Sequence, residues 1–221
     1  SQWIGGFHFI SDSRPSQVIH YIKNHKGELY KIQKNNTITR FHNLEHNPND
    51  PKHLIEPIRT ILSRQSLSSI IIFVNTRNET HKTAIFIAKN LYVNPSAEIL
   101  EARKKLLQEL TRVTNYIDSD ITMCILKGIG IHHAGLMLEE RKLYEEAARN
   151  KTLSVLVATT TLSAGINIHC VSSVFILDIY RIGPNKHRIL MPPAQFTQMV
   201  GRAGRTEKRP GEAFIFANTG D

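Results

Sequence analysis

The chain has 221 residues, of which 41% are hydrophobic, and its 28 Lys and Arg against 19 Asp and Glu give a formal net charge of +9. This length and hydrophobic content suffice for a substantial buried core, and no apolar run approaches the roughly 20 residues of a membrane span, so we expect a globular protein without a membrane partner. The positive charge favours a polyanionic partner such as nucleic acid, but many basic proteins bind none, so charge alone leaves both alternatives open.

The first 50 residues contain only short strand-like segments. These segments cover residues 6–10, 28–32 and 37–41, and they are separated by Lys, Asn and Gly residues. Two prolines near residue 50 end this stretch. We therefore expect residues 1–50 to be a ribbon through which the chain enters a larger domain, which covers residues 51–221.

From residue 51 onward, short apolar runs typical of buried parallel strands alternate with helical patterns. The expected strands cover residues 69–75, 130–132, 154–158, 173–178 and 212–216, and the expected helices cover about 51–65, 79–91, 97–128 as one or two helices, and 138–150. This alternation predicts an α/β fold with a doubly wound, mainly parallel sheet and helices on both faces. In such a fold, ligands bind at loops beyond the carboxyl ends of the strands.

Four segments with polar residues, three of which also contain glycines, follow expected strands or begin expected helices. They are residues 72–77 (IFVNTR), 130–136 (GIHHAGL), 158–167 (ATTTLSAGIN) and 198–205 (QMVGRAGR). Each string alone has an ordinary structural explanation, such as a basic turn, a pair of core histidines or a threonine helix cap. In this order and spacing, however, the four resemble motifs four, four-a, five and six of the superfamily-two helicases, especially those of the Ski-type branch.

This resemblance covers nearly the whole chain, and it implies the second RecA-like lobe of an ATP-dependent helicase motor. Within the branch, the chain is most similar to archaeal DNA-repair helicases and to the helicase region of theta-type DNA polymerases. DNA is therefore the favoured substrate, and the alternative is an RNA helicase of the exosome-assisting or spliceosomal type. A hypothesis of another class is a non-catalytic binding module, which the two arginines of motif six disfavour. A nuclear location is expected in a eukaryote and a cytoplasmic one otherwise.

Motif six carries Arg202 and Arg205, which a helix would project from one face because they are three residues apart. Two guanidinium groups suit a triphosphate, since they keep their charge and match phosphate oxygens. The resemblance implies that both are catalytic arginine fingers, that Gln198 is a neutral donor near the nucleotide, and that Gly165 and Asn167 link the nucleic-acid contact to the nucleotide cleft. The alternative for either arginine is a structural pairing with a carboxylate.

The expected nucleic-acid contacts are made to the backbone rather than to the bases. The hydroxyl and amide groups of Thr159 and Thr160 stand where a strand leads into a helix, a position suited to phosphate oxygens. The resemblance adds Asn75, Thr76, Arg77, His133, Ala134 and Gly135 to this set. Arg77 could instead be an ordinary surface charge.

Residues 179–191 form a longer connection than a strand-to-helix link needs, which is about 2 to 6 residues. The Gly183-Pro184-Asn185 turn between apolar flanks predicts a β-hairpin. The resemblance implies a pin that separates duplex strands, in which Tyr180, Arg181, Lys186 and Arg188 contact nucleic acid. The alternative is a solvated loop with incidental charge.

The sequence contains neither a GxxxxGK[ST] phosphate loop nor an Asp-Glu pair for magnesium. ATP and Mg²⁺ are therefore expected to be held mainly by a first RecA-like lobe, and this chain alone is expected not to hydrolyse ATP. The other expected partners are DNA with a single-stranded tail and the downstream domains of the same protein. No metal site is expected, because Cys124 and Cys170 lie far apart and the adjacent His132 and His133 would point to opposite faces of a strand.

Overall fold

The computed structural model describes residues 18–33, 35, 37–44, 47–64, 68–160, 171–182, 187–204 and 210–217. The strands are β1 (Val18–Lys23), β2 (Glu28–Ile32), β3 (Ile38–Asn43), β4 (Ile70–Val74), β5 (Ile129–His132), β6 (Val155–Thr159), β7 (Ser173–Ile176), β8 (Tyr180–Ile182), β9 (Arg188–Leu190) and β10 (Gly211–Phe216). The helices are α1 (Ile55–Arg64), α2 (Arg77–Asn90), α3 (Ala97–Thr114), α4 (Ser119–Leu126), α5 (Leu138–Arg149) and α6 (Pro193–Val200).

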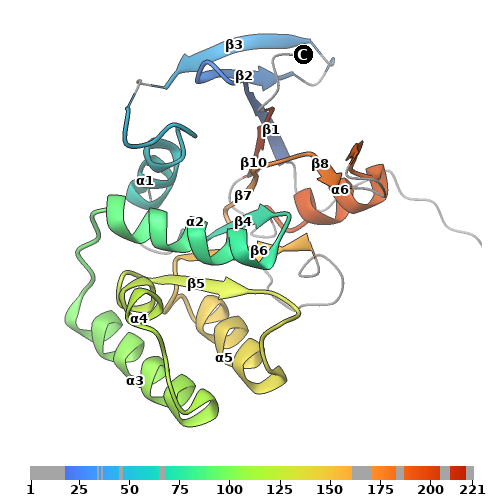
Figure 1. Cartoon of the computed structure of the whole chain (residues 1–221). Coiled ribbons are helices and arrows are strands. Elements are labelled where there is room, and N and C mark those ends of the chain that lie inside the picture. Colours follow the sequence, from blue (N-terminus) through green and yellow to red (C-terminus); the bar gives the residue numbers. More distant parts are fainter. Residues whose placement is uncertain are drawn as a thin grey trace, which may run out of the picture.

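Eight strands form one sheet in the order β3-β2-β1-β10-β7-β4-β6-β5 (Figure 1). In the order from β1 to β5 all neighbouring strands pair in parallel, and the antiparallel pairs of this sheet are β1–β2 and β2–β3 at one end, so that β2 alone among the described strands of the sheet is reversed. Every residue of the central strands β4, β6 and β7 is buried, as expected for strands that are covered on both faces. The predicted doubly wound, mainly parallel α/β fold is confirmed.

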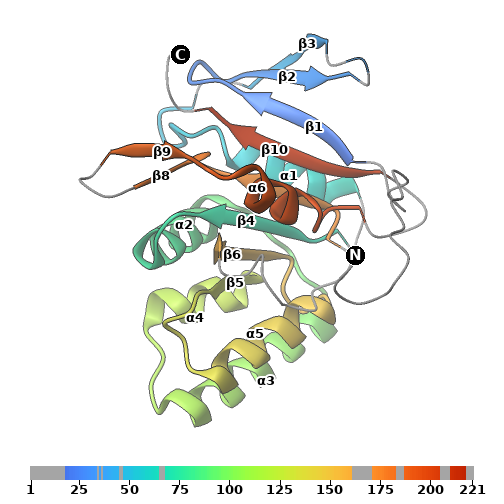
Figure 2. The same ribbon diagram turned by 90° about the vertical axis from the view of Figure 1, so that its right-hand side faces the viewer.

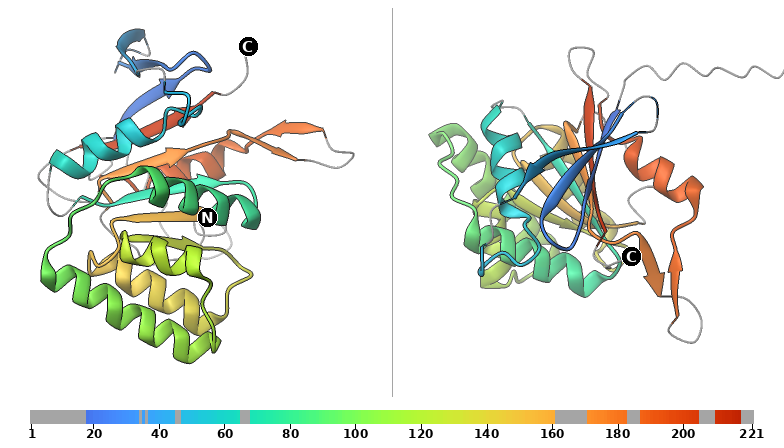
Figure 3. Two further views of the ribbon diagram at one scale, coloured as in Figure 1. Left: turned by 60° about the vertical axis from the view of Figure 1, so that its left-hand side comes forward. Right: turned by 90° about the horizontal axis from the view of Figure 1, so that it is seen from above.

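Helices cover both faces of the sheet, because the crossover connections run in opposite directions along it. The connection from β4 to β5 carries α2, α3 and α4, whereas those from β5 to β6 and from β7 to β10 run back and carry α5 and α6. Right-handed crossovers then place α2 and α5 on opposite faces. The view from above in Figure 3 shows α1 and α2 on one side of the sheet and α6 on the other.

The N-terminal ribbon extends the same sheet. The predicted strands at 28–32 and 37–41 correspond to β2 and β3, and the segment 6–10 lies outside the described residues. β1, which pairs with β10, was not predicted, because its polar residues interrupt the apolar run. One of them, Lys23, is only 1% exposed, and its ammonium lies 5.1 Å from the centre of the Phe216 ring. The division of the chain at residue 50 stays a prediction.

The other expected elements agree with the structure to within two residues at most ends. The clearest exception is the helix expected from residue 51, since α1 begins only at Ile55, whose N–H donates to Asp50 Oδ2 at 2.7 Å. The long helical pattern at 97–128 is two helices, separated where Asn115 takes a left-handed conformation with φ of 61°. None of the described helices combines the length and apolarity needed to cross a bilayer.

Candidate nucleic-acid and nucleotide interface

The loops of motifs four and four-a and the start of motif five meet at the carboxyl edge of the parallel strands. β6 lies between β4 and β5, and their last residues are level, since Val74 pairs with Thr159 and His132 with Ala158. The residues that follow these strands therefore emerge side by side. The β8–β9 hairpin follows β7 at the same edge and projects beyond the strand ends (Figure 2).

Asn75 and Thr76 have firm structural partners in the loop after β4. Thr76 and Glu79 form a capping box, in which Thr76 Oγ1 accepts the Glu79 N–H and Glu79 Oε2 accepts the N–H groups of Thr76 and Asn75. The Asn75 side-chain amide donates to the carbonyl oxygen of Tyr180 at 2.7 Å. Asn75 thus ties the end of β4 to the base of the hairpin. Contacts of these two residues with nucleic acid stay predictions.

Arg77 lies across the turn that follows β5. Its side chain is exposed, and a Cβ built on Gly135 would come within 2.8 Å of Arg77 Nη1. Gly135, which has no Cβ, leaves room for this close approach. Among the described residues, Arg77 has no carboxylate within salt-bridge distance. Motifs four and four-a consequently share one small surface that carries an exposed guanidinium.

His133 is only 5% exposed, and both of its ring nitrogens have partners. Nδ1 accepts the N–H of Gly135 at 3.1 Å, and Nε2 lies 3.1 Å from Nε2 of His81. Burial, followed by the nearby His81 and Arg77, lowers the pKa of His133 to about 4. His133 is therefore neutral at physiological pH. A direct contact of its ring with nucleic acid stays a prediction.

His132 points the other way, as expected. It is 2% exposed, and its Nε2 lies 3.0 Å from Oε1 of Glu145 on α5. His132 therefore lies inside the domain, beside Glu145. Within the described part of the chain, no three His, Cys, Asp or Glu side chains are grouped closely enough to hold a metal ion.

The two threonines of motif five that the structure describes stand at the end of β6. Thr159 is the last residue of that strand and is buried, and Thr160 follows it in a partly exposed position. Gly165 and Asn167 lie outside the described residues. The assignment of this segment to a phosphate contact stays a prediction.

Motif six departs from the prediction in one respect. Helix α6 ends at Val200, so Arg202 does not lie on a helix. The expectation that a helix presents both arginines is therefore wrong for Arg202. Gly201 ends the helix, and Ala203 then forms a parallel bridge with Val171, where the Gly204 N–H donates to the Val171 carbonyl oxygen at 3.1 Å. Arg202 is thus held in a turn between α6 and this bridge.

The structure describes only one of the other two predicted motif-six residues. Gln198 is exposed on α6, close to the turn that carries Arg202. Arg205 lies outside the described residues. The roles of all three side chains at a nucleotide stay predictions.

The hairpin between β7 and α6 is confirmed, since β8 and β9 pair antiparallel with Tyr180 opposite Leu190. At its base, the Arg188 guanidinium lies 4.5 Å from the centre of the Tyr180 ring, and Arg188 Nη2 lies 3.4 Å from Asp178 Oδ1. Arg181 on β8 is exposed, as are the apolar residues of β9. Lys186 lies in the tip, outside the described residues.

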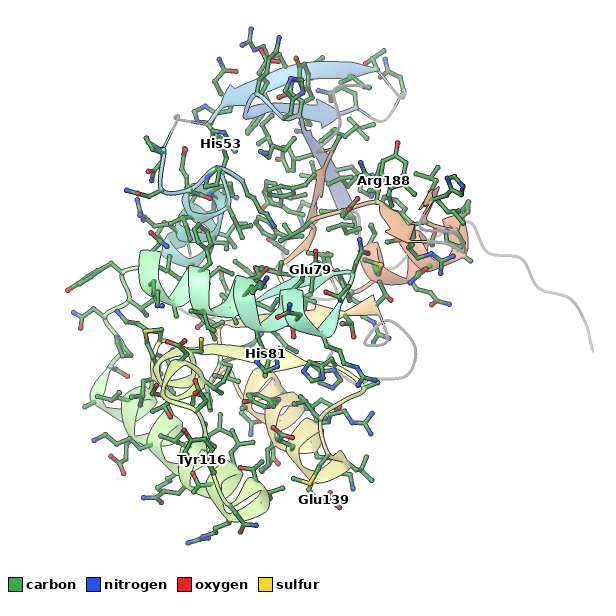
Figure 4. The ribbon with its side chains drawn as sticks, viewed as in Figure 1. His53, Glu79, His81, Tyr116, Glu139 and Arg188 are labelled. Carbon is green, nitrogen blue, oxygen red and sulfur yellow. The ribbon has the colours of Figure 1, made fainter. Side chains whose placement is uncertain are left out.

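Two residues of α2 that organise this edge were not among the predicted site residues. Glu79 closes the capping box, and His81 contacts His133; Figure 4 labels both on the helix. The Thr76-x-x-Glu79 spacing is a capping-box signature that could have identified Glu79. His81 lies four residues after Arg77, so a helical-face argument could have placed it beside Arg77.

Acid should destabilise the domain through His133. Its pKa of about 4 lies below the ordinary value of 6.5, so between these values the unfolded chain binds a proton that the folded chain does not. The stabilisation is therefore complete above pH 6.5 and is lost as the pH falls towards 4, at a cost of at most about 1.4 kcal/mol per pH unit. Urea unfolding at pH 7.5, 6 and 5 should show a smaller acid loss for His133→Gln than for the unsubstituted chain. Parallel pH profiles for the two proteins would contradict this assignment.

The fold and the site together define a class of protein. A doubly wound parallel sheet whose strand-end loops gather hydroxyl, amide and guanidinium groups at one edge has the architecture in which α/β domains bind ligands beyond the carboxyl ends of their strands. Comparison with known proteins makes the class specific: residues 53–207 match the family model of the helicase conserved C-terminal domain. The chain belongs to this family.

Its relatives include helicases named for DNA and for RNA. The chain is 33% identical over 157 residues to the ATP-dependent DNA helicase Hel308 of Methanocella arvoryzae, a match that covers 68% of this chain and 20% of the relative. It is 36% identical over 151 residues to Hel308 of Pyrococcus horikoshii, covering 67% of this chain and 20% of that protein. It is also 28% identical over 220 residues to the DExH-box ATP-dependent RNA helicase DExH14 of Arabidopsis thaliana, covering 97% of this chain and 9% of that protein.

These matches confirm the resemblance to the second lobe of a superfamily-two helicase, and they are consistent with the Ski-type branch. The chain spans about a fifth of the length of these two Hel308 relatives, since each match covers 20% of the relative.

Proposed function

We propose that this chain is the second motor lobe of an ATP-dependent DNA helicase. The observation that carries the proposal is that the described parts of motifs four, four-a and five meet at one edge of the sheet in a member of the helicase C-terminal family. Two Hel308 relatives are named ATP-dependent DNA helicases, which favours DNA over RNA. DNA repair, with a nuclear location in a eukaryote and a cytoplasmic one in a prokaryote, is part of the same proposal.

In this function the lobe supplies one wall of a nucleotide site. Arg202, held in its turn after α6, and Gln198, exposed on the same helix, fit the side of the site that faces the phosphates, and Arg205 follows in the sequence. A first lobe supplies the phosphate loop and the magnesium ligands, since this sequence has no such loop. ATP hydrolysis supplies the free energy for movement between the lobes. This chain alone therefore does not turn over ATP.

The carboxyl edge of the sheet holds the nucleic-acid backbone. Arg77 offers a cation, the partly exposed Thr160 offers hydroxyl and amide groups next to the buried Thr159, and the Ala134–Gly135 turn exposes backbone next to Arg77. A single-stranded tail lies along these loops, and the hairpin meets the duplex. Because backbone contacts discriminate poorly between sugars, the choice of DNA over RNA requires its own test.

The test compares unwinding of DNA and RNA duplexes with the same sequence and the same single-stranded tail by the full-length protein. We expect DNA to be unwound at least about tenfold faster, the scale of about 1.4 kcal/mol in the barrier. Equal rates, or faster unwinding of RNA, would favour the RNA helicase alternative that the Arabidopsis relative represents.

A further inference from the structure

Helix α2 presents two side chains to the turn that follows β5. Arg77 and His81 are four residues apart and therefore lie on one face of the helix. Arg77 packs over Gly135, and His81 contacts His133 with ring centroids 5.3 Å apart. Two residues of one helix thus contact two residues of one turn, at the edge where the nucleic-acid backbone is proposed to lie. Figure 4 labels His81 at this place.

The hydrogen bonds determine which ring nitrogen of His133 carries its proton. Nδ1 accepts the Gly135 N–H at 3.1 Å, so it cannot carry a proton itself, and the single proton of the neutral ring lies on Nε2. That N–H donates to Nε2 of His81, also at 3.1 Å. The Gly135 N–H thus sets the tautomer of His133, and His81 is the acceptor of the Nε2 proton, which fixes the orientation of the ring and so orders the backbone of Gly135.

A charged His133 would not fit this arrangement. A proton on Nδ1 would meet the Gly135 N–H, and a second cation would stand beside Arg77. Burial and the neighbouring His81 and Arg77, with a smaller contribution from His132, hold the pKa of His133 well below its usual range. Arg77 offers a permanent cation to a phosphate at this turn.

We infer that His81 is a positioning residue for nucleic-acid binding: it holds neutral His133 so that the turn at residues 133–136 and the Arg77 guanidinium above it are set to receive one backbone phosphate. The inference rests on the proposed function. In this arrangement, His133 acts through the turn, because its ring is buried and both nitrogens are occupied. Arg77 makes the charged contact.

The test uses His81→Phe, which keeps a planar ring but removes the acceptor, and His81→Gln, which restores an acceptor at a similar reach. In the full-length protein, we expect His81→Phe to weaken binding to a single-stranded oligonucleotide about fivefold to tenfold, the scale of one lost hydrogen bond. His81→Gln should remain within about twofold of the unsubstituted protein. The exposed His25, in the turn between β1 and β2, provides the control His25→Phe, which should not change binding.

The salt dependence of single-strand affinity distinguishes a residue that positions the turn from a residue that contacts a phosphate directly. Arg77→Ala should reduce the slope of log affinity against log salt concentration by about 0.7 to 0.9, because one phosphate contact is lost. His81→Phe should leave this slope unchanged at pH 7.5, since in this arrangement Arg77, and not His81, contacts the phosphate. In ATPase assays, His81→Phe should raise the concentration of single strands needed for half-maximal stimulation far more than it lowers the maximal rate.

Three results would overturn the inference: unchanged affinity in His81→Phe, a slope reduced as in Arg77→Ala, or equal weakening by His81→Gln and His81→Phe. If His81→Phe lowers the melting temperature by more than a few degrees, single-strand binding by His81→Ala, which also lacks the acceptor, is compared with binding by His81→Gln instead. The inference then requires weaker binding by His81→Ala than by His81→Gln. Failure of the unsubstituted protein to bind single strands would instead remove the proposed function, and the inference with it.

Discussion

Replacement of Arg202 by alanine in the full-length protein is expected to lower the maximal rate of ATP hydrolysis by about 1000-fold or more, while nucleotide affinity changes far less. An arginine finger acts chiefly on the charge that develops in the transition state, so its loss affects turnover more than binding. The position of Arg202 supports this role, because the turn after α6 is anchored by Gly204 to the start of the β7 segment. Single-strand-stimulated ATPase and nucleotide binding should be measured on the same preparation.

The control is Arg112→Ala, which removes an exposed arginine from the last turn of α3. It should leave turnover within about twofold of the unsubstituted protein, in keeping with the small effects of most surface substitutions. Arg202→Lys, which keeps the charge but loses the planar fork, should recover only part of the rate. A rate for Arg202→Ala within a few-fold of the unsubstituted protein would make this arginine a structural residue and would favour a binding module over a motor.

The sheet was predictable from the sequence because its strands are buried on both faces. Runs such as Ile70–Val74 and Val155–Thr159 contain almost only β-branched and apolar residues. This composition identifies them as buried strands even when the strands that pair with them are not known. β1 was missed because its burial depends on partners far away in the sequence. Lys23 is accommodated in the interior by the Phe216 ring of β10, and the sequence pattern around Lys23 does not predict this contact.

The place of the site was predictable for a similar reason, since parallel strands bring the loops at their carboxyl ends to one edge. The contacts within the site were not. The hydrogen bond from Asn75 to Tyr180 and the approach of Arg77 to Gly135 each join residues more than 50 positions apart. The end of α6 before Arg202 was missed because the bridge of Ala203 to Val171 draws the chain out of the helix.

Removal of the β8–β9 hairpin should abolish strand separation and preserve ATP hydrolysis stimulated by single strands. The exposed faces of Ile189 and Leu190, which are 44% and 58% exposed, can replace base stacking that is lost when a duplex opens. Arg181 and Arg188 add cations at the same place. None of these four residues belongs to the loops proposed to hold ATP or the single strand, so motor activity and unwinding should separate.

The structure determines where the deletion must begin and end. Tyr180 should be kept, because its carbonyl oxygen accepts the Asn75 side-chain amide and its N–H donates to Asp178. Residues 181–189 are therefore replaced by Asn-Gly, a two-residue turn that can join the paired Tyr180 and Leu190. A second variant, Arg181→Gln with Arg188→Gln, keeps the length of the hairpin and removes the charge of its two described arginines.

We expect the shortened protein to hydrolyse ATP at close to the normal rate with single strands, and to unwind a tailed duplex at least about 100-fold more slowly, a loss of about 2.7 kcal/mol in the unwinding step. The double glutamine variant should unwind at an intermediate rate, because its apolar surface remains while two phosphate contacts are lost. Its unwinding should also depend less on salt concentration than that of the unsubstituted protein. Normal unwinding by the shortened protein would show that the strands are separated elsewhere, and loss of both activities would show that the hairpin supports the motor itself.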